Sequence, residues 1–467
     1  MLGKACWSIV ALAIGKACGS IINEDVAVLG GGASGTYAAV RLREDFNTSI
    51  VVIEQKARLG GHVDTYTIPG INTSVEYGVQ TYFQYGAATD FFARFGVEIG
   101  VFPRRSLTPI NVDISNGALL SAYTPPSMGA TGDALATWVN LTEKYESIME
   151  PGYWNFPAGH AIPPELLLPF GEYATKYNLA AAAPRIMAVS NVGIGGLKKV
   201  LTLYVMQAFG APIAKATSLF SPKGNSNSLL YQRAYDLLKD DVLLESRVAE
   251  ASRELSGIRL VVKREDGTTW LIKAKRLLVT APPSLPNLEP FDLDKQEKAV
   301  FSTWTPTWSF AGVLKVPCIP ENYSVSYISS ASLPSDHLAL RDYPFTLRFD
   351  STGPSGLGLF RVLFATNYTI THAEAKVTIS ESAQKLVTAG TFNTTSDCKV
   401  DFVAFTDHNS ILWRQSVEQI KAGFVQKLYA LQGHRATWYT GGLFGSDYTS
   451  TVWALTSTVL PKLLKGL

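Results

Sequence analysis

Three glycines near the start of the chain have the spacing of a phosphate-binding turn. An apolar segment at residues 26–29 runs into Gly30-x-Gly32-x-x-Gly35, and a helical pattern follows. Gly30 permits a tight turn from strand to helix, Gly32 lets the backbone approach a pyrophosphate, and Gly35 lets helix and strand pack closely. N–H groups at the start of the helix then point at phosphate oxygens. The predicted phosphate-binding residues are Gly30, Gly32, Ala33, Ser34 and Gly35.

A second segment extends this site. Glu54 ends an apolar run 19 residues after Gly35, where an acid at the tip of a second strand accepts hydrogen bonds from a ribose hydroxyl. This context favours a dinucleotide site over an ordinary glycine turn. The pair Gly60-Gly61 would bring another backbone segment against the pyrophosphate, which predicts a tightly held FAD. The residues predicted to bind it here are Glu54, Gln55, Lys56, Arg58, Gly60, Gly61 and His62.

The run from Glu54 to His62 resembles the signature of the flavin amine oxidase superfamily, an acid followed by R-x-G-G-R. The chain departs from it at His62, which replaces the last arginine. Within the superfamily, most of the chain in order is similar to the fungal β-cyclopiazonate dehydrogenase group. The segments that carry this likeness are 77–80, 89–97, 151–157 and 201–206.

The resemblance implies an α/β, amine oxidase-like fold of two domains, in which a Rossmann-type FAD-binding domain is interleaved with an α+β substrate domain. We expect the FAD-binding domain at residues 21–70, 226–287 and 433–467, and the substrate domain at 71–225 and 288–432. Asp266-Gly267 between alternating segments predicts a hairpin in the second FAD-binding stretch.

The resemblance also assigns roles further along the chain. Tyr77, Gly78 and Val79 match a segment that passes beneath the flavin ring, with Gln80 as a hydrogen-bond partner of ring or substrate. The backbone of Val248 would read the adenine, although an edge strand is an equal interpretation. The turn at Gly441 and Gly442 would feed a helix whose N-terminus faces the flavin.

Three more positions bear on the chemistry. By its order in the chain, Lys315 matches a family lysine that lies near flavin N5 through a water and could guide oxygen to the reduced flavin. The alternative, which we favour, is that Lys315 is a strand residue that faces solvent. Leu443 stands where the family has an acid, and Thr451 where it has an aromatic-cage tyrosine. Loss of that tyrosine argues against a simple amine substrate. Trp438, Tyr439 and Trp453 would either wall the site or belong to the core.

A flavin accepts a hydride at N5, so the protein needs no catalytic triad or carboxylate pair. We therefore expect an FAD-dependent oxidoreductase that takes a hydride from a bulky natural product, with oxidative cyclisation as one outcome and molecular oxygen as acceptor. The alternatives are a redox-neutral double-bond isomerase and a non-catalytic binding protein like the Rab GDP-dissociation inhibitors. No CxxC or HExxH motif suggests a metal.

Composition and processing signals bear on the binding partners, the secretion and the glycosylation of the protein. The 467 residues carry a net charge of +2, which gives no reason to expect nucleic acid as a partner. Residues 1–20 read as a signal peptide rather than a transmembrane anchor, which predicts a secreted glycoprotein; an extension on a cytosolic enzyme is the alternative. Cys318 and Cys398 are either bridged or free. The N-x-S/T sequons begin at Asn47, Asn72, Asn140, Asn322, Asn367 and Asn393.

Overall fold

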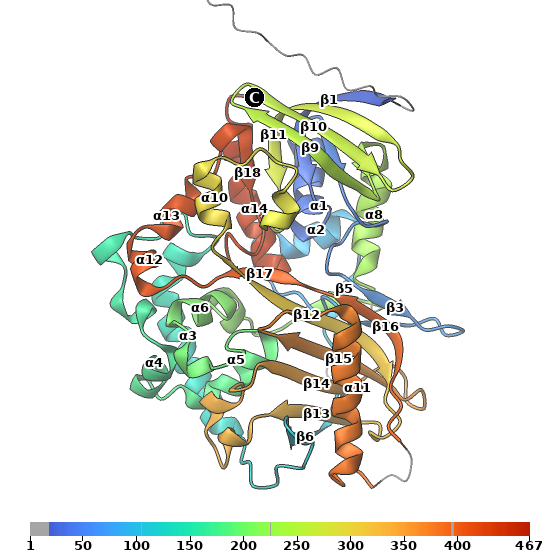
Figure 1. Ribbon diagram of the computed structural model, residues 1–467, viewed down its shortest axis with the longest axis vertical. Coiled ribbons are helices and arrows are strands. Elements are labelled where there is room, and N and C mark those ends of the chain that lie inside the picture. Colours follow the sequence, from blue (N-terminus) through green and yellow to red (C-terminus); the bar gives the residue numbers. More distant parts are fainter. Residues whose placement is uncertain (1–17, 104, 225, 394–396) are drawn as a thin grey trace, which may run out of the picture.

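The computed structural model describes residues 18–103, 105–224, 226–393 and 397–467. Figure 1 shows two lobes, with one large sheet in each. Most of the predicted signal peptide, residues 1–17, lies outside the described residues. The first strand begins at Cys18, three residues before the predicted boundary of the FAD-binding domain.

The upper lobe is built on a seven-stranded sheet whose strands come from three distant stretches of the chain. β1 lies between β2 and β11 and runs parallel to both, while β18 runs parallel to β11 near the other end of the chain. Its strands are β8 (Val242–Leu243), β2 (Ile50–Ile53), β1 (Cys18–Leu29), β11 (Thr269–Val279), β10 (Gly257–Arg264) and β9 (Ser246–Glu254), with β18 (Thr437–Tyr439) beside β11.

The parallel part of this sheet explains the continuous apolar runs in the sequence. Val26, Ala27 and Val28 are all fully buried, as expected where helices cover both faces of a parallel sheet. The predicted hairpin at Asp266-Gly267 joins β10 to β11, and the Gly267 N–H donates to the carbonyl of Arg264 at 3.0 Å.

Two elements from the expected substrate segments pack on the upper lobe. Phe91, in α2 (Ala88–Arg94), lies 4.9 Å from the rings of both Tyr37 and Trp453. Glu297, in α10 (Lys295–Phe301), forms a buried ion pair with Arg253 of β9 at 2.6 Å. Aromatic and charged contacts thus hold α2 and α10, which come from the expected substrate segments, against the upper lobe.

The lower lobe holds the second seven-stranded sheet. Its strands are antiparallel except for β6, which runs parallel to β13. α11 (His372–Thr388) crosses one face of this sheet in Figure 1 and buries Ala375, Ile379, Ala383 and Leu386 against it. The strands are β16 (Asp401–Asp407), β12 (Trp304–Lys315), β15 (Leu359–Thr366), β14 (Phe345–Ser351), β13 (Tyr323–Ile328), β6 (Thr108–Asp113) and β17 (Ser410–Trp413).

Smaller elements surround the two sheets. Two short antiparallel pairs are formed by β3 (Thr65–Thr67) with β4 (Ser74–Glu76) and by β5 (Ile99–Val101) with β7 (Phe220–Pro222). The other helices are α1 (Ala33–Val40), α3 (Met128–Met149), α4 (Phe170–Lys176), α5 (Ala183–Val189), α6 (Thr202–Ala208), α7 (Ala211–Ala214), α8 (Ser228–Leu238), α9 (Leu285–Leu288), α12 (Val417–Lys421), α13 (Phe424–Tyr429) and α14 (Thr449–Leu464).

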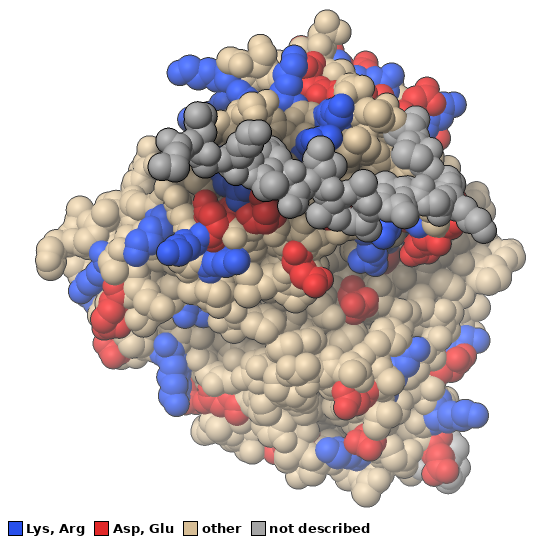
Figure 2. Space-filling view, turned by 45° about the horizontal axis from the view of Figure 1, so that its top comes forward, with Lys and Arg blue, Asp and Glu red and all other residues tan. Residues whose placement is uncertain are grey.

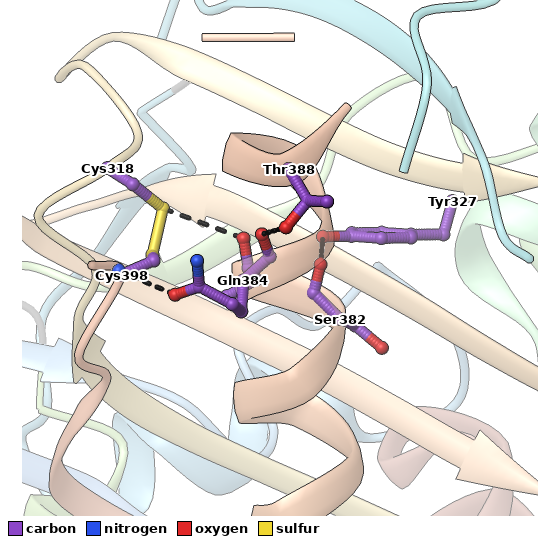
Figure 3. Close-up of a disulfide and its surroundings, with 7 residues drawn as sticks. Cys318, Tyr327, Ser382, Gln384, Thr388 and Cys398 are labelled. Atoms are coloured by element: carbon purple, nitrogen blue, oxygen red, sulfur yellow. Dashed lines mark hydrogen bonds between the residues drawn. A yellow bond between two sulfur atoms is a disulfide. The ribbon is translucent and has the colours of Figure 1, made fainter. Parts of the chain in front are cut away.

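A disulfide joins Cys318 to Cys398, with their Cα atoms 5.2 Å apart. Figure 3 shows the bridge beside α11, where the Cys398 N–H donates to Oε1 of Gln384 at 2.8 Å. The bridge closes a separation of 80 residues, and loop entropy alone would make it worth about 4 kcal/mol. Of the two open interpretations of these cysteines, the structure shows the bridged one.

The molecular surface carries charges of both signs. On the face shown in Figure 2, Lys and Arg side chains alternate with Asp and Glu, so this face presents no broad field of one sign to an incoming ligand. Among the described residues, no helix has the length and apolar character that crossing a membrane requires.

Candidate active site

The predicted glycine turn joins β1 to α1 as expected. Gly30 has a φ of +101°, and a Cβ added at Gly35 would fall 1.9 Å from the Gly30 carbonyl oxygen. Only glycine permits that contact between turn and helix. No side chain of the described residues caps the first turn of α1, so its N–H groups, with the positive end of the helix dipole, are available to an anionic ligand.

Glu54 lies at the tip of β2 with only 5% of its surface exposed. Its Oε2 accepts the Gly31 N–H at 2.6 Å, and its Oε1 accepts the Lys56 N–H at 2.7 Å. Each carboxylate oxygen retains a lone pair for a further donor, which fits the predicted ribose contact. Beside it, the Gly60 N–H donates to the Gly31 carbonyl at 2.8 Å.

Two further glycine segments meet this turn. A Cβ on Gly61 would lie 3.0 Å from Cα of Gly32, so any side chain there would fill the space between the two backbones. A Cβ on Gly441 would lie 3.7 Å from Oγ of Ser34 and 3.6 Å from the Thr280 carbonyl. Segments from the start, middle and end of the chain thus converge on the first turn of α1.

We call the converging turns at Gly30–Gly35, Gly60–Gly61 and Gly441–Gly442 the cradle. One edge of it is formed around His62. The Val79 N–H donates to the His62 carbonyl, and the Tyr77 N–H to the Asp64 carbonyl, both at 3.0 Å. The structure therefore brings the predicted segment Tyr77-Gly78-Val79-Gln80 beside the Gly60-Gly61-His62 turn. Gly78 is required there, because its Cβ would meet the His62 carbonyl oxygen at 2.1 Å.

His408 and Asp64 complete this edge, and the sequence analysis missed both. The His408 ring stacks on His62 with 4.6 Å between ring centroids. Nε2 of His408 lies 2.7 Å from Oδ2 of Asp64, whose other oxygen pairs with Arg58. His408 follows β16, far from the motif in sequence, whereas Asp64 stands two residues after His62 and could have been singled out as an acid beside a glycine motif.

Protein surrounds His62 closely although its side chain keeps access to solvent. Burial, together with the neighbouring His408 and Lys56 side chains, lowers the pKa of His62 to about 3. The pKa of Asp64 is also lowered: its hydrogen bond to His408 and the charge of Arg58 outweigh the burial that would raise it. At neutral pH His62 is therefore an uncharged ring where the superfamily signature has a permanent cation.

Three further predicted site residues, Val248, Gln55 and Gln80, lie around the edges of the site. Val248 lies on β9, whose residue Ser246 donates its N–H to the Glu54 carbonyl at 2.9 Å, so this strand borders the predicted ribose site. Gln55 is exposed directly after Glu54. Gln80 is partly exposed next to Val79 and thus lies at the cradle edge.

Lys315 is not brought to this site. It is exposed at the end of β12, whereas the part of β12 beside His62 is Ser309, whose carbonyl accepts the His408 N–H at 2.6 Å. Six residues of strand separate the two positions, about 20 Å. This exposed position fits the solvent-facing alternative for Lys315, and its catalytic role stays a prediction.

The C-terminal aromatic residues are core rather than walls of the site. Trp453 is fully buried and its Nε1 donates to the Ala33 carbonyl at 3.0 Å, and Tyr439 is 1% exposed. A carboxylate is nonetheless present at the Gly441-Gly442 turn, although Leu443 is apolar. Oδ1 of Asp447 lies 2.2 Å from where a Cβ of Gly442 would stand, and the residue is exposed to solvent.

One cluster has metal-ligand residue types. Asp294, Glu297 and His434 have donor atoms within 4.8 Å of one another. Glu297 already binds Arg253 with both oxygens, and Asp294 caps α10 and pairs with His434 at 2.6 Å. We interpret this cluster as an ion-pair network that anchors α10, because its carboxylate oxygens are engaged.

Comparison with known proteins identifies the family to which this dinucleotide-binding fold belongs. Residues 28–95 match the NAD(P)-binding Rossmann-like domain. The chain is 31% identical over 465 residues to a β-cyclopiazonate dehydrogenase of Aspergillus oryzae, covering 99% of this chain and 98% of that protein. The chain belongs to this family of FAD-dependent oxidoreductases. A relative from Emericella nidulans, 34% identical over 95% of the chain and 92% of its own length, is named an FAD-dependent oxidoreductase.

Solved structures show the same fold. A fatty acid isomerase from P. acnes superposes with a TM-score of 0.69 over 94% of this chain and 99% of its own, at 16% identity. A putrescine oxidase superposes with a TM-score of 0.60 over 96% and 100%, at 14% identity. The predicted two-domain, amine oxidase-like α/β fold is thus confirmed.

FAD is the cofactor of this family, and the residues present fit it. The α1 N-terminus and the bare faces of Gly32 and Gly61 would hold the pyrophosphate, and Glu54 would hold the ribose. The turn at Gly441 and the His62 edge would flank the remainder of the cofactor. When bound, FAD supplies a hydride acceptor at ring nitrogen N5.

We predict that Gly32→Asp gives folded but colourless protein. The nearest atom to a Cβ at Gly32 is 3.7 Å away, and aspartate is a favourable N-cap, so the fold tolerates the change while charge and bulk enter the pyrophosphate path. Absorbance near 450 nm reports the bound flavin, and circular dichroism reports whether the protein is folded. Gly132→Asp, at an open helix position, is the matched control and should stay yellow; a yellow Gly32→Asp protein would contradict the placement.

A second prediction concerns acid stability. Because the pKa of His62 falls from 6.5 to about 3 on folding, the unfolded chain binds a proton across this range that the folded protein does not. This difference lowers the stability of wild type as pH falls from 6.5 towards 3. His62→Gln should lose less of its Tm between pH 7 and pH 4 than wild type. The exposed His160→Gln variant should follow wild type; parallel Tm curves for wild type and His62→Gln would exclude this contribution.

Proposed function

We propose that the enzyme removes a hydride and a proton from a bulky, partly apolar natural product, with molecular oxygen as the electron acceptor. The hydride would leave a carbon beside a nitrogen or an aromatic ring. An electrophilic, iminium-like product would then be open to attack by a nucleophile of the same molecule, which closes a ring. Oxygen takes up two electrons and two protons and forms hydrogen peroxide, so the reaction is balanced.

The observation that carries this proposal is the junction of the two lobes at the His62 edge. The Ser309 carbonyl of the lower sheet accepts the His408 N–H at 2.6 Å, and His408 stacks on the cofactor turn. A substrate held on the lower sheet would thus meet the cofactor at one place. The names of the relatives support the reaction class, since β-cyclopiazonate dehydrogenase denotes an oxidation of a fungal metabolite.

Two residues suit an oxidation of this kind. The neutral His62 places no permanent positive charge opposite a cationic intermediate. The buried Thr451, whose hydroxyl donates to the Ser446 carbonyl at 2.8 Å, stands where a cage tyrosine would flank a small amine. Both features favour a larger substrate over a simple amine.

A redox-neutral isomerase is the second candidate, favoured by one comparison. The solved structure with a TM-score of 0.69 is a fatty acid isomerase. In that case a hydride would be taken from the substrate and returned to it at another carbon, with no net oxidation and no use of oxygen.

The two candidates give different products. We expect purified wild type to consume oxygen with β-cyclopiazonate, the compound in the relatives' name, or with a related metabolite. It should release peroxide and give a product about 2 Da lighter. Gly32→Asp protein should give neither product nor peroxide. A product of unchanged mass without peroxide would establish the isomerase, and no conversion of any such compound by yellow protein would contradict this substrate class.

We further propose that the protein is a secreted glycoprotein. All six sequon asparagines are exposed, as glycosylation requires, and the Cys318–Cys398 bridge is of the kind that persists in oxidising compartments. Cleavage after residue 20 would leave β1 paired with β11 from Ile21 onward. These features support the reading of residues 1–20 as a leader.

Expression in a fungal secretory host should yield protein whose mass falls on treatment with peptide-N-glycosidase. Asn72→Gln, beyond β3 at an exposed loop, should remove one glycan increment, whereas the exposed non-sequon change Asn155→Gln should remove none. An unchanged mass after enzyme treatment, or full-length protein retained inside the cells, would contradict this proposal.

A further inference from the structure

The lower sheet has two unlike faces. The face beneath α11 is apolar and carries Phe310, Leu347, Phe349, Val362 and Phe364, all of them buried. The opposite face carries the alternate residues of the same strands. Register places Ala311, Leu363, Arg348, Ser326 and Asn111 in one row across it. Most of these side chains are neither fully buried nor exposed, so this face is polar and still accessible.

Two arginines on this face share a single carboxylate. Nη2 of Arg361 lies 3.2 Å from Oδ2 of Asp350, and Nε of Arg348 lies 2.9 Å from the same oxygen. The other oxygen of Asp350 accepts the hydroxyl of Ser324 at 2.7 Å. Among the described residues, the one hydrogen bond that the two guanidinium groups make is Arg361 to Asp350, although each group offers several donors.

A third arginine adds charge without a counterion. Arg341 donates from Nη1 to the carbonyls of Ser190 at 2.8 Å and Val192 at 3.3 Å, and from Nη2 to the Met187 carbonyl, so it supplies charge rather than free donors. Within the described residues it has no carboxylate partner. Burial, and then the charge of Arg348, lowers the pKa of Arg341 to about 9. Three arginines and one carboxylate leave two positive charges here.

Uncompensated charge in such surroundings is costly unless an anion shares it. The side chains of Arg348 and Arg361 remain 29% and 17% exposed, so a small molecule has access to them. The unused N–H donors are of the type that bind a carboxylate with two parallel hydrogen bonds.

This cluster is connected to the cofactor edge. Nδ2 of Asn191 donates to Oγ of Ser309 at 3.2 Å, and the neighbouring Ser190 and Val192 carbonyls hold Arg341. Residues 190–192 therefore run from the His62 edge to the arginines. Arg348 lies two residues along and two strands across from Ser309, which corresponds to about 12 Å on a sheet.

We propose that Arg348 and Arg361, with the added positive charge of Arg341, form an anion subsite that binds a carboxylate group of the substrate. The oxidised carbon of that substrate would lie at the His62 edge, roughly 12 Å away. The inference rests on the proposed function in one respect, that the ligand is the enzyme's own small-molecule substrate. It adds the charge of that substrate and the distance between its anionic group and its reacting centre.

Three probes that share one ring test the charge preference. Indole-3-acetate, indole-3-acetamide and tryptamine are negative, neutral and positive at pH 7.5, and calorimetric titration of the FAD-loaded full chain gives their Kd values. We expect indole-3-acetate to bind at least about tenfold more tightly than indole-3-acetamide, with tryptamine weakest. Equal binding of the three, preference for tryptamine, or no binding of any of them at millimolar concentration would overturn the subsite.

Single substitutions test whether these arginines cause the preference for the anionic probe. Arg348→Gln and Arg361→Gln should each weaken indole-3-acetate about tenfold and leave indole-3-acetamide nearly unchanged. Arg348→Lys, which keeps the charge, should retain most of the preference. This variant still tests the subsite if a glutamine variant fails to fold. Asp350→Asn should tighten indole-3-acetate, because it removes the competing carboxylate. Arg259→Gln, at an exposed position of β10, is the matched control; equal losses in it and in Arg348→Gln would refute the assignment.

Flavin absorbance of the same samples separates this inference from the proposed function. Yellow, active protein without charge preference would leave the oxidoreductase intact and remove the anion subsite. Charge preference that depends on Arg348 in protein that oxidises no substrate would retain the subsite and contradict the proposed reaction.

Discussion

The site depends on backbone segments that approach one another more closely than side chains allow. At Gly35 and Gly78 an added Cβ would stand 1.9 and 2.1 Å from a backbone carbonyl oxygen, far inside contact distance. Glycine at these two positions therefore fixes the α1 turn and the segment predicted to pass beneath the flavin ring. Because these contacts are made between backbones, they set the geometry of the cradle before any functional side chain is considered.

This constraint explains which parts could be predicted from the sequence. The cradle residues from Gly30 to His62 are close together in the chain, and their spacing alone reports the turn, the strand tip and the second glycine pair. The hairpin at Asp266-Gly267 was predictable for the same reason, since local turn chemistry determines it. FAD followed from these residues together with the family resemblance.

Residues that reach the site through strand register could not be predicted in this way. His408 lies 344 residues from Asp64, its hydrogen-bond partner, and no spacing rule links them. Lys315 matched a family lysine by order along the chain, but its place in the sheet depends on where β12 pairs with its neighbours. The positions of α2 and α10 depended likewise on an aromatic cluster and a buried ion pair that join distant segments.

The interleaving of the lobes has a consequence for biosynthesis. β11 is flanked by β1 near the start of the chain and by β18 at Thr437–Tyr439, so the upper sheet cannot close until almost the whole polypeptide has left the ribosome. Long-range pairing of this kind is slow and exposes unpaired strand edges meanwhile. Cofactor capture must therefore be a late event, and nascent chains would depend on chaperones until their last strand arrives.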